Sequence, residues 1–219
     1  MNQSRKPGYR AFTLIELLVV IGIIAILLGV AMPGLTGAIL SGRITQATAH
    51  ARQVALALRM YAQDNDGAFP DKDTYQTSND AFRELFPEYL ETEAIFPVAS
   101  SPVGKKADNA IEPAARILAR GENHWAFVQG LSTTSNASWP LVVDHSDGSG
   151  HFHADPSQPG GTWRGTKAIV VRCDTSAAAL KLHGTGQKRY LPRYNDDRKN
   201  ALNVRDYMGD SPKLLEPAK

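Results

Sequence analysis

One stretch constrains everything else in this sequence. It is an apolar run from Phe12 to Met32 whose only ionisable residue is Glu16. The run has about the 20 residues that a helix needs to cross a bilayer at 1.5 Å per residue. It is too long and too uniformly apolar to be one face of a buried core helix. We therefore predict a membrane-spanning helix near the N-terminus.

The charges that flank this run predict its orientation. Three basic residues precede it, namely Arg5, Lys6 and Arg10, and the next one downstream is Arg43. Because basic flanks stay on the cytoplasmic side, we expect residues 1–10 in the cytoplasm and the chain after about Leu40 outside. A secretory signal peptide with a small-residue cleavage site at Thr36-Gly37-Ala38, or an uncleaved anchor, are the alternatives.

Glu16 is the feature that neither alternative explains. A charged side chain costs roughly 2.5–3.5 kcal/mol at mid-membrane and less near an interface, so it normally has a partner. The apolar run offers no counter-charge. Cleavage between Ala11 and Phe12 would create one, because the new α-amine of Phe12 can meet the Glu16 carboxylate of its own chain or of an adjacent subunit.

The residues around this bond, Arg10-Ala11-Phe12-Thr13-Leu14-Ile15-Glu16, and the apolar residues after them closely resemble a known motif. It is the prepilin cleavage/methylation motif of type IV pilins and type II secretion pseudopilins. The resemblance implies that prepilin peptidase cuts between Ala11 and Phe12 and N-methylates Phe12, and that Glu16 docks each subunit against its neighbour. The family usually has Gly in place of Ala11, which implies slower processing here.

The same resemblance implies a structural subunit of a type IV pilus-like or type II secretion pseudopilus filament, and no enzyme. Its expected partners are further copies of itself, other pilin-like subunits, prepilin peptidase, an inner-membrane assembly platform and membrane lipid. Its expected location is the cytoplasmic (inner) membrane as a single-pass protein with a periplasmic head, and the assembled filament lies outside the membrane. A periplasmic binding or enzymatic domain on a signal peptide or uncleaved anchor is the alternative function.

A second similarity lies beyond the membrane helix. Residues 61–67, 85–90 and 95–97 resemble the pilin-like proteins of planctomycete- and verrucomicrobium-type bacteria. The sequence fits secretion pseudopilins, surface pilins, competence-type filament subunits and minor tip subunits alike, so all four remain open.

The helix is expected to continue past the membrane. Pro33 predicts a kink or a helix end, since it removes a backbone hydrogen bond. An apolar stripe at helical spacing then follows: Ile44, Ala47, Ala51, Val54, Leu58 and Tyr61. Asp64-Asn65-Asp66-Gly67 predicts the helix end, with Gly67 as the C-cap.

The rest of the sequence predicts an α+β head, in which the long N-terminal helix packs on a small antiparallel β-sheet. A short helix is expected from Ser78 to Pro87 or Leu90, and strands over 124–128, 141–144, 167–173 and 177–182. Thr175 stands in the turn of the last hairpin, where related proteins often have Gly. The predicted organisation is a basic leader (1–11), a transmembrane assembly helix (12–40), its amphipathic outer half (41–66), the globular head (67–186) and a polar, partly disordered C-terminal extension (187–219).

One loop of the predicted head has the residue types of a metal site. Asp144, Asp147 and Asp155 could bind Ca²⁺ through their carboxylates, whereas His145, His151 and His153 would favour Zn²⁺. The spacing matches no EF-hand or zinc pattern, so a solvated loop without cofactor is the favoured interpretation.

Charge and cysteine content bound the remaining functions. The first eleven residues hold three of the 24 basic side chains and none of the 22 acidic ones, so the remainder is nearly neutral and no nucleic-acid partner is expected. The single Cys173 cannot form an intramolecular disulfide, so the head must depend on its core or on a metal.

Overall fold

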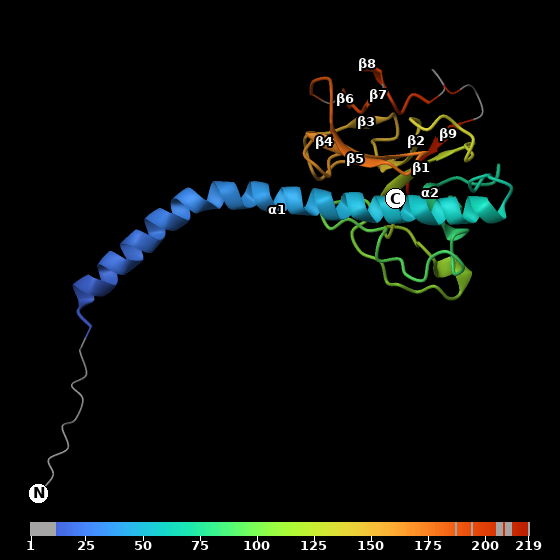
Figure 1. The fold of residues 1–219 in the computed structure, drawn as a ribbon. Helices are drawn as coiled ribbons and strands as arrows, with labels where there is room; N and C mark the ends of the chain where they lie inside the picture. The colour runs from blue at the N-terminus through green and yellow to red at the C-terminus, as the bar shows by residue number, and fades with distance from the viewer. Residues whose placement is uncertain (1–11, 187, 194, 205–207, 209–211, 219) are drawn as a thin grey trace, which may run out of the picture. The chain divides into compact units, whose positions relative to one another are not determined.

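The computed structural model describes residues 12–186, 188–193, 195–204, 208 and 212–218 (Figure 1). The predicted leader, including Ala11, lies outside the described residues. The chain divides into two compact units, Met1–Gly42 and Arg43–Lys219. Helix α1, Leu14–Asp64, begins in the first unit and ends in the second. A long N-terminal helix followed by an antiparallel sheet confirms the predicted α+β pilin-like layout.

The part of α1 in the first unit is apolar on all sides. Its large hydrophobic side chains from Leu14 to Ile39 are exposed, with exposed fractions between 44% at Val20 and 82% at Leu14. Among the described residues, no single helix meets the length and hydropathy expected of a membrane span, but Leu14–Val30 and Gly34–Asp64 meet them together as a pair bent by 47°. The kink at Pro33 stays a prediction.

The part of α1 in the second unit buries its predicted stripe. Ile44, Ala47, Ala51, Val54 and Leu58 are buried, and Tyr61 is half-buried. Asp66 and Gly67 both have a left-handed backbone, with φ of 52° and 81°, and Gly67 N–H donates to the Ala62 carbonyl at 2.8 Å. The helix therefore ends in the predicted stretch, but the left-handed turn already begins at Asp66.

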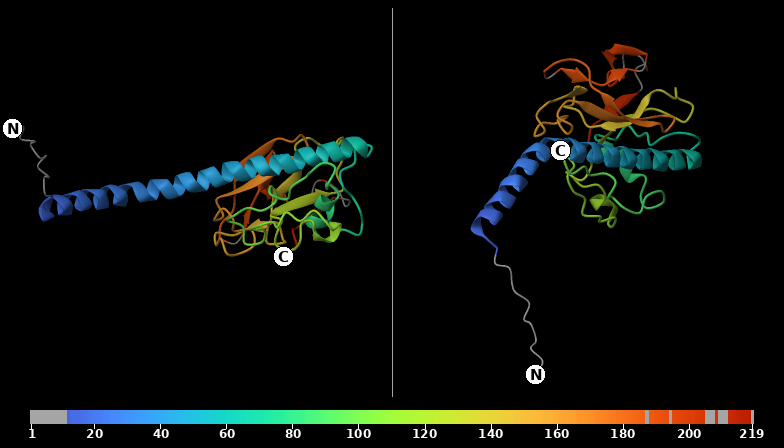
Figure 2. Two further views of the ribbon diagram at one scale, coloured as in Figure 1. Left: turned by 90° about the horizontal axis from the view of Figure 1, so that it is seen from below. Right: turned by 60° about the vertical axis from the view of Figure 1, so that its left-hand side comes forward.

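The head is built on a five-stranded antiparallel sheet in the order β5-β4-β2-β1-β9. Its strands are β1 (Trp125–Gln129), β2 (Pro140–Asp144), β4 (Lys167–Arg172), β5 (Ala177–Lys181) and β9 (Lys213–Leu215). Figure 2 shows the sheet beside the outer part of α1. The four predicted strands are confirmed to within two residues at each end.

The short elements of the head differ more from the prediction. Helix α2 spans only Ser78–Arg83, and a 3-10 turn, η1, spans Ala114–Arg116. The expected end of α2 at Pro87 or Leu90 is therefore wrong. Its start is fixed by a capping box in which Thr77 and Asp80 exchange side-chain and backbone hydrogen bonds.

The C-terminal segment is not a surface extension in its described part. Strand β6 (Arg189–Tyr190) pairs with β3 (His151–Phe152), β7 (Pro192–Arg193) pairs with β8 (Asp196–Asn200), and β9 adds to the central sheet beside β1. Leu191, Ala201 and Leu202 are buried in an apolar cluster with residues of β1, β2 and β4. The predicted boundary at 186/187 is wrong because a few isolated apolar residues, too sparse to show a period, complete the core.

Thr175 lies in the turn between β4 and β5. This residue has φ of 67°, a conformation that is costly for a β-branched side chain. We predict that Thr175→Gly raises the free energy of unfolding by about 0.5–1 kcal/mol, measured by thermal unfolding, because glycine adopts this backbone freely. The exposed loop residue Thr74, which lacks a positive φ, is the control, since Thr74→Gly should destabilise slightly. A destabilised Thr175→Gly protein would contradict the strain argument.

Candidate functional site

The N-terminal turn of α1 is the site at which the motif residues meet. Thr13 precedes the first helical residue, and its N–H and hydroxyl both donate to Glu16 Oε2, at 2.9 and 2.7 Å. Glu16 N–H donates back to Thr13 Oγ1 at 3.3 Å. This reciprocal pair is a capping box, which satisfies N–H groups that a helix start otherwise leaves without a partner.

The capping box gives Glu16 hydrogen-bond partners in its own segment, which the sequence analysis did not predict. Thr13-Leu14-Ile15-Glu16 has the Thr-x-x-Glu spacing of such a box, a signal that the sequence analysis missed. Hydrogen bonds satisfy the carboxylate but do not neutralise it, and no ion pair to Glu16 occurs among the described residues from 12 onward. The counter-charge remains to be supplied.

Phe12 lies directly beside this box. Its side chain is 72% exposed, and the peptide N–H that follows it, on Thr13, is the group that already donates to Glu16. An α-amine made at Phe12 would therefore lie one residue from an existing contact with the carboxylate. The predicted cleavage partner Ala11 lies outside the described residues, so the cut itself stays a prediction.

The second predicted site, the 144–155 loop, contains a buried polar chain. Gly160 N–H donates to His145 Nε2 at 2.9 Å, so the His145 proton is on Nδ1. That atom lies 3.2 Å from His124 Nδ1, which therefore accepts, and His124 Nε2 donates to Asp144 Oδ1 at 2.6 Å. Two imidazoles thus connect the Gly160 loop to strand β2.

The other oxygen of Asp144 is also engaged. Oδ2 accepts from Trp163 Nε1 at 2.8 Å and from the backbone N–H of Ile169 in β4. Asp144 is 1% exposed. Its two oxygens accept hydrogen bonds from three separate parts of the chain, at His124, Trp163 and Ile169. This arrangement fits a structural role for Asp144.

The remaining loop acids make local turns. Asp147 Oδ1 accepts from Ser149 N–H and hydroxyl at 2.8 and 2.7 Å, and Asp155 Oδ1 accepts from Ser157 N–H and hydroxyl at 2.9 and 2.7 Å. Within the described residues, Asp144, Asp147 and Asp155 do not form a group whose ligand atoms all lie within 4.8 Å. The structure does not bring the predicted calcium ligands together, and calcium binding there stays a prediction.

Cys173 has the properties of a packing residue. It is 2% exposed, and burial raises the pKa of its thiol to about 12. The thiol therefore stays protonated at neutral pH and is a poor nucleophile.

Comparison with known proteins gives one match. The prokaryotic N-terminal methylation motif matches residues 6–32, a range that contains Ala11, Phe12 and Glu16. Neither curated proteins nor solved structures give a match to the chain. The match confirms the predicted motif, supports a type IV pilin-like or pseudopilin subunit and implies a membrane-anchored N-terminal helix. Proteins with this motif are structural subunits, and the planctomycete similarity stays an expectation.

The buried chain around Asp144 generates a stability prediction. Asp144→Asn should lower the free energy of unfolding by about 3 kcal/mol, because one of the donors on His124, Trp163 or Ile169 would face an amide N–H. Thermal unfolding should show a fall in Tm of roughly 6–12 °C. Asp155→Asn is the matched control, since its exposed turn can keep the accepting oxygen; an equal fall in both variants would refute the structural role.

Proposed function

We propose that this chain is a subunit of a type IV pilus-like or type II secretion pseudopilus filament, processed by prepilin peptidase and assembled through its N-terminal helix. The observation that carries the proposal is the methylation motif at residues 6–32, with the capped Glu16 one turn from the bond to be cut. The apolar surface of α1 supports it further, because a helix that is apolar on every side needs lipid or other helices around it.

The proposed assembly has three steps. The apolar half of α1 holds the unassembled subunit in the cytoplasmic membrane with the head outside. Prepilin peptidase then removes residues 1–11 and methylates the new amine of Phe12. The helix finally leaves the lipid and packs among the helices of neighbouring subunits.

Glu16 sets the register of this packing. Lipid is as apolar as the helix surface, so the transfer from lipid to a helix bundle gains little from the hydrophobic effect. Packing and charge pairing must therefore distinguish one register from another. A carboxylate hydrogen-bonded to Thr13 presents its charge at one position along the helix, where the Phe12 amine of a neighbour neutralises it.

Two variants separate the charge of Glu16 from its capping role. Glu16→Gln keeps the side-chain oxygen that the capping box needs but removes the charge, because Gln also serves in such boxes. Thr13→Ala removes the cap, worth about 1 kcal/mol, and keeps the charge. We predict cleaved subunits in both cases, with filament incorporation lost in Glu16→Gln and close to wild type in Thr13→Ala, measured by sheared-filament fractionation and immunoblotting.

The opposite result identifies a different role. Normal filaments from Glu16→Gln together with failed assembly of Thr13→Ala would mean that Glu16 acts only as a helix cap. Normal filaments from both variants would show that neither the charge of Glu16 nor its capping box is needed for filament assembly.

A further inference from the structure

The segment between α2 and β1 lacks regular structure over most of its length. Residues 84–124 contain only the three-residue turn η1, Ala114–Arg116. Connections longer than about 12–15 residues without secondary structure are uncommon in compact domains. This segment nevertheless buries several residues, among them Phe96 and Leu118, so specific contacts must fix its path.

Three carboxylates converge within this segment. Glu93, Asp108 and Glu122 each place one ligand oxygen so that all three lie within 4.8 Å of one another. Glu93 is fully buried, Glu122 is 8% exposed, and Asp108 lies at the surface. The group therefore opens to solvent on the Asp108 side and has its deepest charge at Glu93.

The buried member of this group has a free oxygen. Glu93 Oε1 accepts from the backbone N–H of Leu118, whereas Oε2 has no hydrogen-bond partner although it is fully buried. Arg116 pairs with Asp108 at 2.5 Å, at the exposed end of the group. A buried carboxylate oxygen that lacks a partner and lies in a group of three acids has surroundings that a bound cation would satisfy.

Backbone donors hold the other carboxylate in place. Glu122 Oε1 accepts from Asp108 N–H at 2.9 Å, and Oε2 accepts from Ala119 N–H at 2.6 Å. Each oxygen keeps a second lone pair, so these contacts orient Glu122 without excluding a metal ion.

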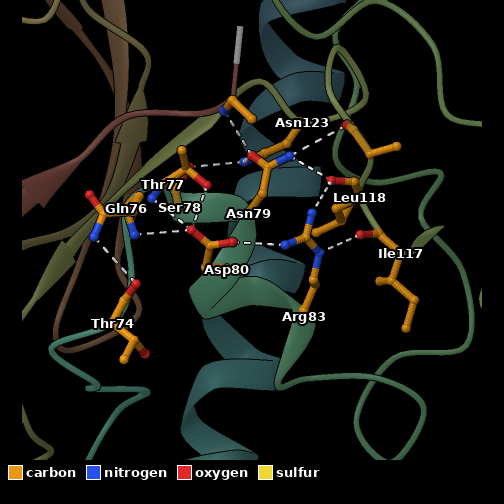
Figure 3. A network of polar contacts seen from close by, with 12 residues as sticks. Thr74, Gln76, Thr77, Ser78, Asn79, Asp80, Arg83, Ile117, Leu118 and Asn123 are labelled. Atoms are coloured by element: carbon orange, nitrogen blue, oxygen red, sulfur yellow. Dashed lines mark hydrogen bonds and ion pairs between the residues drawn. The ribbon is translucent and has the colours of Figure 1, made fainter. Parts of the chain in front are cut away.

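Helix α2 fixes the adjoining loop from the other side, as Figure 3 shows. Asn79 Nδ2 donates to the Leu118 carbonyl at 2.6 Å, and Arg83 Nε donates to the Ile117 carbonyl at 2.7 Å. Leu118, whose N–H binds Glu93, is thereby anchored to the head before any ion binds. The carboxylates are preorganised by elements outside the group itself.

We propose that Glu93, Asp108 and Glu122 bind a Ca²⁺ ion that ties the 84–124 segment together. An all-oxygen donor set suits a hard cation and disfavours Zn²⁺, which prefers Cys and His. The three oxygens lie within 4.8 Å of one another, so one Ca²⁺ with oxygen ligands at about 2.3–2.6 Å can reach all of them, and its flexible coordination suits three carboxylates better than the near-ideal octahedron that Mg²⁺ demands. The site is distinct from the 144–155 loop and does not rest on the proposed filament.

The test uses the full-length chain in detergent micelles, first freed of metal with a chelator. With a dissociation constant of about 10⁻⁴ M, about 1 mM CaCl₂ should raise Tm by roughly 3–6 °C, followed by tryptophan fluorescence. Calorimetric titration should give one ion per chain.

Glu93→Gln is the decisive variant. It keeps the oxygen that accepts from Leu118 N–H and removes the buried charge. We expect its Tm without calcium to equal or exceed that of the wild type, and its response to calcium to be lost. Asp108→Asn, at the surface, provides a second variant and should also lose most of the response.

Two control variants complete the design. Glu91→Gln changes an exposed acid two residues away, and Asp147→Asn changes an acid of the 144–155 loop. Both should keep the full calcium shift. The proposal is overturned if the wild type shows no shift at 10 mM CaCl₂ (about 100 times the expected dissociation constant), if Glu93→Gln and Asp108→Asn retain it, if Asp147→Asn abolishes it, or if Mg²⁺ produces the same shift.

Discussion

An ionised side chain at the start of an otherwise apolar helix is stable in lipid only if it is both hydrogen-bonded and neutralised. Glu16 meets the first condition through Thr13, whose N–H and hydroxyl bind its carboxylate. The second condition is unmet among the described residues, and the position of Phe12 beside the capping box shows how cleavage would meet it. The proposed function depends on this one unbalanced charge. The apolar surface around it allows the helices of neighbouring subunits to pack, but it does not select one register between them.

The head deals with its buried acids in two contrasting ways. Asp144 accepts hydrogen bonds on both oxygens from side-chain and backbone donors of several strands and loops, so neither oxygen lacks a partner. Glu93 has one oxygen bound and the other without a partner, next to two further carboxylates. The hydrogen bonds of Asp144, which the sequence proposed as a metal ligand, fit a structural role, whereas Glu93, which no sequence pattern singled out, belongs to the cation site that we propose.

The sequence predicted those parts of the fold that have a local period. The apolar run, the stripe from Ile44 to Leu58 and the β4–β5 hairpin each repeat over several residues, and they form the predicted helix and strands. Strand β9 and the buried residues near Leu191 were not predicted, because single apolar residues in a polar stretch show no periodicity. Their burial depends on tertiary contacts with the sheet, which the local sequence does not reveal. Glu93, Asp108 and Glu122 are separated by more than ten residues each, so no spacing rule could have joined them. Thr13 was the avoidable omission, since its Thr-x-x-Glu spacing is a local signal.

The identity of the mature N-terminus tests the central claim most directly. Mass spectrometry of the intact protein, isolated from the membranes of cells that contain a prepilin peptidase, should give a chain that starts at Phe12 and carries one methyl group on its amine. A chain that retains Met1, or one that begins near Ile39, would leave Glu16 without the proposed counter-charge and would contradict the account.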